Sequence, residues 1–453
     1  MIDSTLQLPL SAPQRDFWEA ALAYPVPSTH IYAAEYFEIR GALDTDAFER
    51  ALRQVIREAQ TLHTTRIVLD GDTPVRVLDA ALADDWALER VDLAGTKDAH
   101  AVALAGMRAH CTGAIELARG PFFRHTLYRI APNHYYWYHG YAHILVDGYS
   151  GSLIATRAAE LYSAFAAGAK APPARFASLA ELQLDEDAYR ASEQFAHDRR
   201  YWLERFADQP RTVTLAGPAR FPERDDGPDL RETRIASANE SARIEAVAKG
   251  LFTSTVPRLV TALTAAYLYL NTGAHDIVLS VAAMARTSAR ERRTPTQCAN
   301  MLPLRLHVEP GHTLDDLCRQ ANREMTALRQ HQRYRMGDLH RELTSLDNGQ
   351  GVFGPEINIM AFDYDLRFGD CVTTSHNLSV GTTDDLMVNL TDRRNGEPLR
   401  FDFDASPQYY SRDALNAHVG QFLTFMRIAL DDPFATLGAL ESRLDFQPAA
   451  LAG

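Results

Sequence analysis

The sequence lacks the features that mark membrane, secreted and metal-dependent proteins. No window holds ~18 uncharged apolar residues, and the N-terminus has no basic region followed by an apolar one, so neither a membrane span nor a secretory signal is expected. The His-Glu-x-x-His zinc motif and the Gly-rich phosphate loop are absent as well. The four cysteines lie far apart, without the paired spacing of zinc sites or disulfide frameworks: Cys111, Cys298, Cys318 and Cys371. We therefore expect a cytoplasmic protein with no metal and no bound nucleotide or other cofactor.

An excess of basic residues is also missing. The formal net charge is −13, whereas a nucleic-acid partner requires a basic face, so nucleic acid is excluded as the expected ligand. Apolar residues make up 46% and charged residues 23% of the chain, as in ordinary globular proteins. At 453 residues the chain is longer than one hydrophobic core usually serves, and two domains are expected.

The order of the predicted elements favours α/β layers. Strand-like runs such as Ile31–Ile39 alternate with helical patterns such as Asp44–Ala59 through the first half of the chain. The segment Gly168-Ala-Lys-Ala-Pro-Pro-Ala has the composition of a turn and linker. We place the boundary there and predict domains over residues 1–175 and 176–453. No internal repeat or low-complexity tract is present.

The most informative stretch runs from Tyr135 to Ser150. Its aromatic start is typical of a half-buried strand, and His143 and Asp147 then bracket three apolar residues. Gly148 breaks the strand, and Ser150 is placed to cap a helix over residues 150–167. The pattern predicts a His and an Asp near the mouth of a buried strand, before a tight turn and a helix.

A short motif of this kind has more ordinary interpretations. A core strand with a hydrogen-bonded His and a terminal Asp is the commoner meaning of an isolated His-x-x-x-Asp-Gly. A hydrolase nucleophile elbow at Gly148-Tyr-Ser150 would require Gly two residues after the Ser, and position 152 is Ser. The nucleophile interpretation is therefore rejected, and the motif needs support from the rest of the chain.

That support is a resemblance to the condensation domains of nonribosomal peptide synthetases. Their core motif is His-His-x-x-x-Asp-Gly, usually followed by an aromatic residue and Ser, and only its first His is missing here, replaced by Ala142. Other segments are similar to further motifs of the family in the same order, from about residue 8 to 432. They are Gln14 with Trp18, residues 58–66, Arg286 with Cys298–Pro303, and His331-Gln-Arg-Tyr334. With Phe362-Asp-Tyr364, they look closest to enterobactin-type siderophore synthetases.

The resemblance implies a fold, an activity and partners. Family members consist of two chloramphenicol acetyltransferase-like lobes in a V-shaped pseudo-dimer, with a tunnel between them and floor-loop and latch segments in the C-terminal lobe. Carrier proteins bring in a donor thioester and an aminoacyl acceptor on phosphopantetheine, and the acceptor amine attacks the thioester to give an amide. The expected protein is a monomeric, peptide-bond-forming acyltransferase of nonribosomal peptide or siderophore biosynthesis.

Site residues follow from the same resemblance. His143 is expected at the reaction centre as base or hydrogen-bond acceptor, and the amide N–H near Gly148 suits a developing oxyanion. Asp147 is expected to hold the loop through an Arg of the second lobe, which maps best onto Arg286 and otherwise onto Arg305. Further residues expected to line the substrate tunnel are Tyr149, Ser150, Asn300, Ser379 and Asp385.

Ala142 is the departure from the pattern. The family's first His generally supports the site, so its loss fits a divergent but active domain, a deliberate substitution or a condensation-deficient relative. Because His143, Asp147 and Gly148 still match, we expect Ala142→His to be tolerated. Two functional alternatives stay open: a chain-release enzyme that forms an ester or amide with a soluble acceptor, and an idle recruitment domain. Met1 hints at an N-terminal domain of a larger synthetase, but a free-standing protein remains open.

Overall fold

The computed structural model describes residues 5–23, 31–218, 229–250, 254–344, 354–361, 366–381, 383–393 and 396–444. The chain forms two compact units. The first comprises Met1–Ser192, Arg286–Ala299 and Asp363–Thr382, and the second comprises Glu193–Ala285, Asn300–Phe362 and Thr383–Gly453. The first unit thus extends past the boundary expected at residue 175, and two later segments of the chain return to it.

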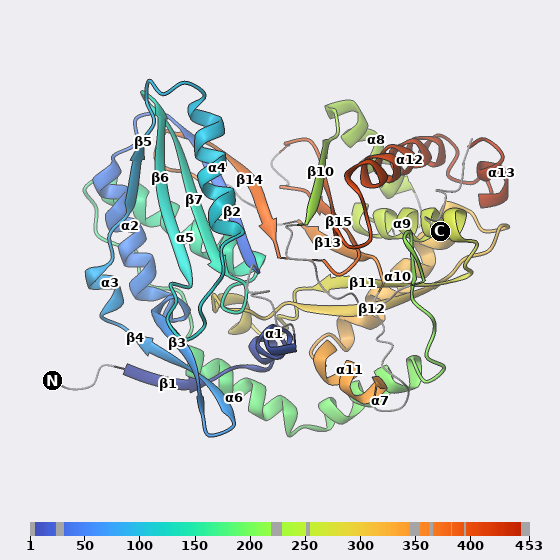
Figure 1. Ribbon diagram of the computed structural model, residues 1–453, viewed down its shortest axis with the longest axis horizontal. Helices are drawn as coiled ribbons and strands as arrows, with labels where there is room; N and C mark the ends of the chain where they lie inside the picture. Colours follow the sequence, from blue (N-terminus) through green and yellow to red (C-terminus); the bar gives the residue numbers. More distant parts are fainter. Residues whose placement is uncertain are drawn as a thin grey trace. The chain divides into compact units, whose positions relative to one another are not determined.

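The main sheet of the first unit has five strands in the order β14-β2-β7-β6-β5. They are β14 (Val372–Val380), β2 (Tyr32–Arg40), β7 (His134–Ala142), β6 (Phe123–Ala131) and β5 (Glu89–Asp92). All neighbours are antiparallel except β5, which runs parallel to β6. The edge strand β14 comes from the second half of the sequence, so this sheet joins residues more than 300 positions apart (Figure 1).

Helices cover both faces of this sheet. The aromatic run of β7 alternates, so that Trp137 and Tyr138 point to opposite faces. Trp137 packs edge-on against Phe48 of α2 (Thr45–Glu58), which lies beside α5 (Gly148–Ala166) (Figure 1). On the other face, α4 (Ala99–Cys111) covers Tyr138 and its neighbours. The strand that carries the motif is therefore buried on both sides.

A smaller sheet completes the first unit. Its strands are β1 (Thr5–Pro9), β4 (Thr73–Asp79) and β3 (Thr64–Asp70), all antiparallel. The remaining elements of the first unit are α1 (Ala12–Ala23), the 3₁₀ turn η1 (Gln60–His63), α3 (Leu82–Asp85), α6 (Leu179–Arg190) and η2 (Glu291–Arg293). Of these, α1 matters most for function, because Phe17 on it reaches the motif residue His143.

The second unit is built on a six-stranded mixed sheet. Its order is β10 (Leu230–Ile235), β16 (Arg400–Ala405), β15 (Leu386–Thr391), β13 (Glu356–Met360), β11 (Asp276–Ala283) and β12 (Asn300–His307). A hairpin of β8 (Val213–Thr214) and β9 (Gly217–Pro218) adds two short strands. The helices are α7 (Glu193–Arg205), α8 (Ala238–Gly250), α9 (Val256–Thr272), α10 (Leu314–Gln330), α11 (Met336–Thr344), α12 (Arg412–Asp431) and α13 (Leu437–Glu441).

The predicted α/β class is confirmed, but several local details were wrong. Residues 144–146 form a turn instead of extending the strand, although all three are buried. The helix cap after the motif is Asp147, whose carboxylate accepts the Ser150 N–H, and Ser150 lies inside the helix. Among the described helices, none is both long and apolar enough to cross a membrane.

Candidate active site

The motif residues lie on a tight turn that follows β7. The N–H groups of Leu145 and Val146 donate back to the Ala142 carbonyl, at 2.9 and 3.3 Å, which closes the turn at the strand end. The Leu145 carbonyl then accepts the Gln297 N–H at 2.9 Å and the Thr61 hydroxyl at 3.2 Å. These bonds fix the apolar centre of the turn. Its first and last residues, His143 and Asp147, have different polar partners.

His143 lies among apolar and neutral groups. The Phe17 ring stacks on the His143 ring with centroids 5.0 Å apart, and the backbone N–H of His143 donates to the Ile31 carbonyl at 2.8 Å. Burial lowers the pKa of His143, and this effect outweighs the charge of Asp147, the Val380 backbone and the Gln297 side chain, which act in the opposite direction. The imidazole is therefore neutral at neutral pH, the state in which one ring nitrogen can accept a hydrogen bond.

Asp147 is almost completely buried and its two oxygens are heavily used. Oδ1 accepts the Ser150 N–H at 2.8 Å, and Oδ2 accepts the N–H groups of Cys298 and Ala299 at 2.9 and 3.1 Å. Burial alone would disfavour its charge, but the Arg286 guanidinium and the donated N–H bonds hold the pKa of Asp147 below its usual value. The carboxylate is thus an internal anchor with its acceptor positions occupied.

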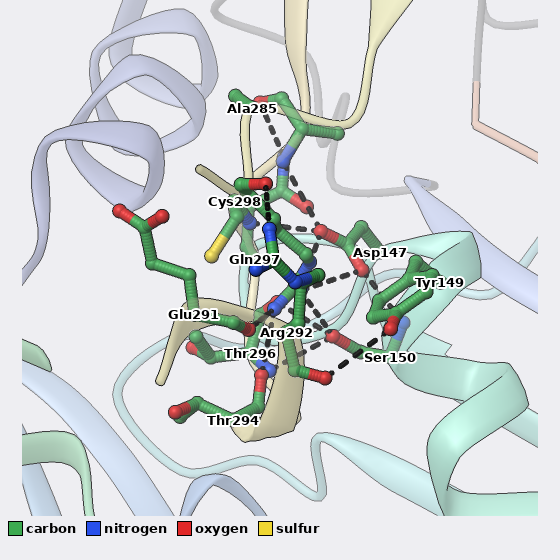
Figure 2. A network of polar contacts seen from close by, with 12 residues as sticks. Asp147, Tyr149, Ser150, Ala285, Glu291, Arg292, Thr294, Thr296, Gln297 and Cys298 are labelled. Carbon is green, nitrogen blue, oxygen red and sulfur yellow. Dashed lines mark hydrogen bonds and ion pairs between the residues drawn. The ribbon is translucent and has the colours of Figure 1, made fainter. Parts of the chain in front are cut away.

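Arg286 fastens the returning segment, residues 286–299, to this turn. Figure 2 shows its partners Asp147, Ser150 and Thr296 close together. Its Nη2 contacts both Asp147 oxygens at 3.1 and 3.0 Å, the Ser150 hydroxyl at 2.7 Å and the Thr296 carbonyl at 2.6 Å. Nη1 donates to the carbonyls of Glu291 and Thr294. Because both side chains of the ion pair are buried, at 0% and 3% exposure, the pair is geometrically strict and removal of either partner strands a charge.

The expected pairing of Asp147 with Arg286 is present, and the alternative with Arg305 is not. Arg305 instead pairs with Asp276 and Asp208 inside the second unit. One aspect of the expectation was wrong: Arg286 belongs to the first compact unit together with Asp147, so this interaction is internal to one unit.

Two further motif residues join the network. The Ser150 hydroxyl donates to the Thr296 carbonyl at 2.7 Å and accepts the Thr296 N–H at 2.9 Å. The Tyr149 ring lies under the Arg286 guanidinium at 4.9 Å, and its hydroxyl donates to the Arg292 carbonyl. Gly148, the first residue of α5, is exposed at a helix N-terminus where Asp147 caps the Ser150 N–H. A helix N-terminus favours negative charge in front of it.

The remaining predicted tunnel residues have other surroundings. Ser379 lies near the end of β14, and its hydroxyl accepts the N–H of Gly381 at 3.4 Å. Asn300 and Asp385 belong to the second unit. There, the Asn300 amide donates to the carbonyls of Gln332 and Tyr334, and Asp385 accepts the Tyr410 hydroxyl at 2.8 Å. Burial raises the pKa of Asp385 to about 7.

Within the described residues, one group has the geometry of a metal site. His197, Asp198 and His331 of the second unit offer ligand atoms within 4.8 Å of one another. Two of these atoms are already hydrogen-bonded to each other, because Asp198 Oδ1 lies 2.8 Å from His331 Nδ1. The same oxygen also accepts the Gln194 amide N–H at 2.7 Å. His331, which belongs to one of the segments that resemble family motifs, is thus a buried, hydrogen-bonded residue of the second unit.

Several residues of this site were missed by sequence reasoning. Phe17 stacks on His143, Gly381 has no side chain where one would meet the His143 ring, and Thr296 and Gln297 hold the turn through backbone groups. Backbone contacts leave no side-chain signature in a sequence. The usable signal was proximity, because Phe17 lies between the motif residues Gln14 and Trp18, and Cys298 begins the matched segment that ends at Pro303.

The comparison with known families agrees with this geometry. The model of the condensation domain matches residues 5–452. The chain therefore belongs to the condensation domain family, whose members in nonribosomal peptide synthetases are acyltransferases that form peptide bonds and have the chloramphenicol acetyltransferase-like fold. Their substrates are tethered on the phosphopantetheine of carrier proteins.

Curated relatives come from several biosynthetic systems. The chain is 38% identical over 97% of its length to an isonitrile lipopeptide synthase of Streptomyces coeruleorubidus, and 35% identical over 96% to a dimodular nonribosomal peptide synthase of Bacillus subtilis. It is 28% identical over 98% to enterobactin synthase component F of Escherichia coli. It spans only 30%, 18% and 34% of the lengths of these relatives, respectively.

Solved structures resemble the whole chain. A variant of the starter condensation domain of rhizomide synthetase, in complex with C8-CoA, superposes with a TM-score of 0.87 at 34% identity, covering 96% of this chain and 97% of that one. The first condensation domain of the calcium-dependent antibiotic synthetase gives a TM-score of 0.86 at 31% identity, with 96% and 99% covered.

Proposed function

We propose that this chain forms an amide bond between an acyl thioester and the amine of an aminoacyl group, both held on carrier proteins. The amine nitrogen attacks the thioester carbon, the C–N bond forms, the C–S bond breaks and the carrier thiol leaves, while the nitrogen gives up one proton. The observation that carries the proposal is a neutral His143 on a turn held by the buried Asp147–Arg286 pair, in a chain of this family.

The role proposed for His143 is to accept the proton of the attacking amine, first as a hydrogen bond. An α-amino group has a pKa of roughly 8, so a useful fraction is unprotonated at neutral pH and needs orientation more than deprotonation. A lowered imidazole pKa suits this role, because the ring stays a hydrogen-bond acceptor over the working pH range.

The surrounding residues are proposed to hold and polarise the reacting group. Asp147 and Arg286 position the turn, and their occupied hydrogen-bonding groups favour this role over direct substrate contact. The exposed helix start at Gly148 is proposed to face the developing oxyanion. Tyr149 and Ser379 stay candidates for substrate contact. The bonds of Ser150 and Asn300 favour supporting roles, and the role of Asp385 stays a prediction.

The donor is proposed to be an acyl or aryl group that is not an amino acid. This rests on the solved starter condensation domain in complex with C8-CoA at 34% identity and on the lipopeptide synthase relative at 38%. The partners are a donor carrier and an acceptor carrier, with the chain itself a monomer in the cytoplasm. No observation favours an ester-forming or idle domain over this assignment.

The donor class is tested with an acceptor carrier loaded with an amino acid and a panel of donors. Octanoyl, 2,3-dihydroxybenzoyl and aminoacyl thioesters are supplied separately, and intact mass spectrometry follows the acceptor carrier. We expect acylation from the octanoyl or aryl donor, at least tenfold faster than from the aminoacyl donor. Preference for the aminoacyl donor would overturn the donor assignment but leave amide formation standing. Transfer only to a free amine or alcohol would replace the carrier-bound acceptor.

A further inference from the structure

Ala142, which stands where the family has its first His, is fully buried at the end of β7. Its partner in the antiparallel register is Tyr32, the first residue of β2. Side chains of directly opposed residues share one face of a sheet, so Tyr32 and Ala142 both point to the face that α4 covers. What fills the volume beside the Ala142 methyl group must come from this face.

A histidine from α4 packs against the neighbours of Ala142 on this face. The His110 ring lies 4.6 Å from the Tyr32 ring, and its Nδ1 is 2.6 Å from the Tyr138 hydroxyl. A Cβ built on Gly140, the residue two positions before Ala142, would lie 3.1 Å from the same Nδ1. His110 therefore packs against the part of β7 that faces α4, and the missing side chain at Gly140 makes room for the Tyr138 hydroxyl, the nearest atom, and for the His110 ring bonded to it.

We propose that His110 is a positioning residue for His143: it supplies from α4 the imidazole that the motif lacks at position 142. With Tyr32, it braces the ends of β2 and β7. The residue before Tyr32 is Ile31, whose carbonyl holds the His143 N–H at 2.8 Å. Loss of the brace loosens this carbonyl and thus the orientation of His143. The expected effect on catalysis rests on the proposed function, whereas the packing of His110 against Tyr32 and Tyr138 does not depend on it.

The surroundings make His110 a neutral polar brace. Burial lowers its pKa to about 4, with Arg124 adding to the effect and Glu89 opposing it. The other groups near it are the Tyr138 hydroxyl and Cys111, whose Sγ is 3.4 Å from that hydroxyl. The ring is therefore uncharged over the working range of the protein, and its Nδ1–hydroxyl bond persists there.

The packing reverses the expectation for Ala142→His. An added imidazole would meet the Tyr32 ring and His110, and overpacking of this kind is destabilising. We expect Ala142→His to lower both melting temperature and turnover, and Ala142→His combined with His110→Ala to regain at least half of the lost melting temperature. A tolerated single variant, or strictly additive losses in the double variant, would overturn the assignment. The comparison of melting temperatures among the single and double variants needs no assumption about the reaction.

The positioning role is tested by side chains that replace one ring nitrogen. Asn presents its amide near the place of Nδ1, whereas Gln presents it near Nε2. We expect His110→Asn to retain most of kcat. We expect His110→Gln and Tyr138→Phe to lower kcat about 10- to 100-fold, with KM for the acceptor unchanged. All variants are assayed at a temperature well below their melting temperatures. Equal kcat in all three variants, or equal loss in all three, would overturn the proposal.

The same helix provides a matched control. His100 on α4 makes a similar contact with Tyr136, its Nδ1 lying 3.0 Å from the hydroxyl, but at the other end of β7. His100→Gln should leave kcat within about twofold of the wild type. A loss in this variant equal to that of His110→Gln would show a general effect of α4 packing and overturn the specific role of His110. Absence of any product from the wild-type protein would instead contradict the proposed function.

Discussion

Asp147 and His143 lie only four positions apart in the sequence, but their surroundings are opposite. The Asp147 carboxylate is charged, buried and bonded to Arg286 and to three backbone N–H groups. The His143 ring is neutral and packs against Phe17. A side chain whose acceptor positions are filled is suited to hold structure, whereas a neutral imidazole keeps a ring nitrogen that can accept a hydrogen bond. We therefore propose a stabilising role for Asp147 and a role at the reaction centre for His143.

Removal of the Asp147 carboxylate tests the first assignment. Asp147→Ala leaves Arg286 buried without its counter-ion, so we expect the free energy of unfolding to fall on the order of 3–5 kcal/mol, together with turnover. Chemical denaturation and product assays check this. Glu58→Ala is the control, because Glu58 pairs with the buried Arg157 elsewhere in the first unit and should cost stability without activity. Lost activity at unchanged stability would make Asp147 a direct participant.

At the scale of elements, the site depends on segments that return from the second half of the chain. The segment 286–299 supplies the clamp on the turn, and β14 ends at Val380, next to Gly381. Gly381 has a φ of +103°, and a Cβ there would lie 3.4 Å from the His143 Cδ2 and 3.5 Å from Ile31. The backbone at the end of β14 thus limits the position of the imidazole.

Gly381→Ala tests this contact. The positive φ is strained for any side chain, at a cost of about 1–3 kcal/mol, and relief of the strain shifts backbone that touches His143. We expect a lower melting temperature and turnover reduced about tenfold or more. Gly95→Ala is the control, with a φ of +83° and no atom within 4 Å of the added Cβ. Similar turnover losses in both variants would argue against a specific contact with His143.

Most helices and strands could be predicted from the sequence because their patterns are local. The helix start at Asp44, whose side chain accepts the N–H groups of Asp46 and Ala47, is one example. The turn at residues 144–146 could not be predicted, because three buried apolar residues fit a strand and a turn equally well.

The packing around Ala142 could not be predicted either. Ala142 and His110 are 32 positions apart in the sequence, and only the packing of α4 on the sheet brings them near each other. The resemblance pointed to Arg286 and Cys298, but not to Thr296 or Gln297, which act through the backbone.

At the scale of the whole molecule, buried titratable groups of two kinds set the pH range of stability. Burial lowers the pKa of several histidines, so the unfolded chain binds more protons below about pH 6.5 and stability falls as the pH drops. Burial, with Asp384 nearby, raises the pKa of Glu356 to about 8. The stability from neutral Glu356 and Asp385 is therefore lost as the pH rises from about 4 through 7–8.

The alkaline side of this profile can be tested with one substitution. Glu356→Gln keeps an acceptor for the Thr383 hydroxyl, 2.8 Å away, and cannot ionise. We expect the fall in melting temperature between about pH 6 and pH 9 to shrink by several degrees relative to the wild type. Glu116→Gln, at a carboxylate whose side chain is 67% exposed, should not change the profile. Parallel profiles for Glu356→Gln and the wild type would contradict a buried, neutral Glu356.

The central claim is that this chain forms amides with His143 at the reaction centre. The direct measurement is the single-turnover rate at which an aminoacyl carrier gains the acyl mass of the donor, for the wild type and for His143→Ala. We expect product with the wild type and a rate about 10²- to 10⁴-fold lower for His143→Ala, with a melting temperature within a few degrees of the wild type. A variant rate within about threefold of the wild type would contradict it.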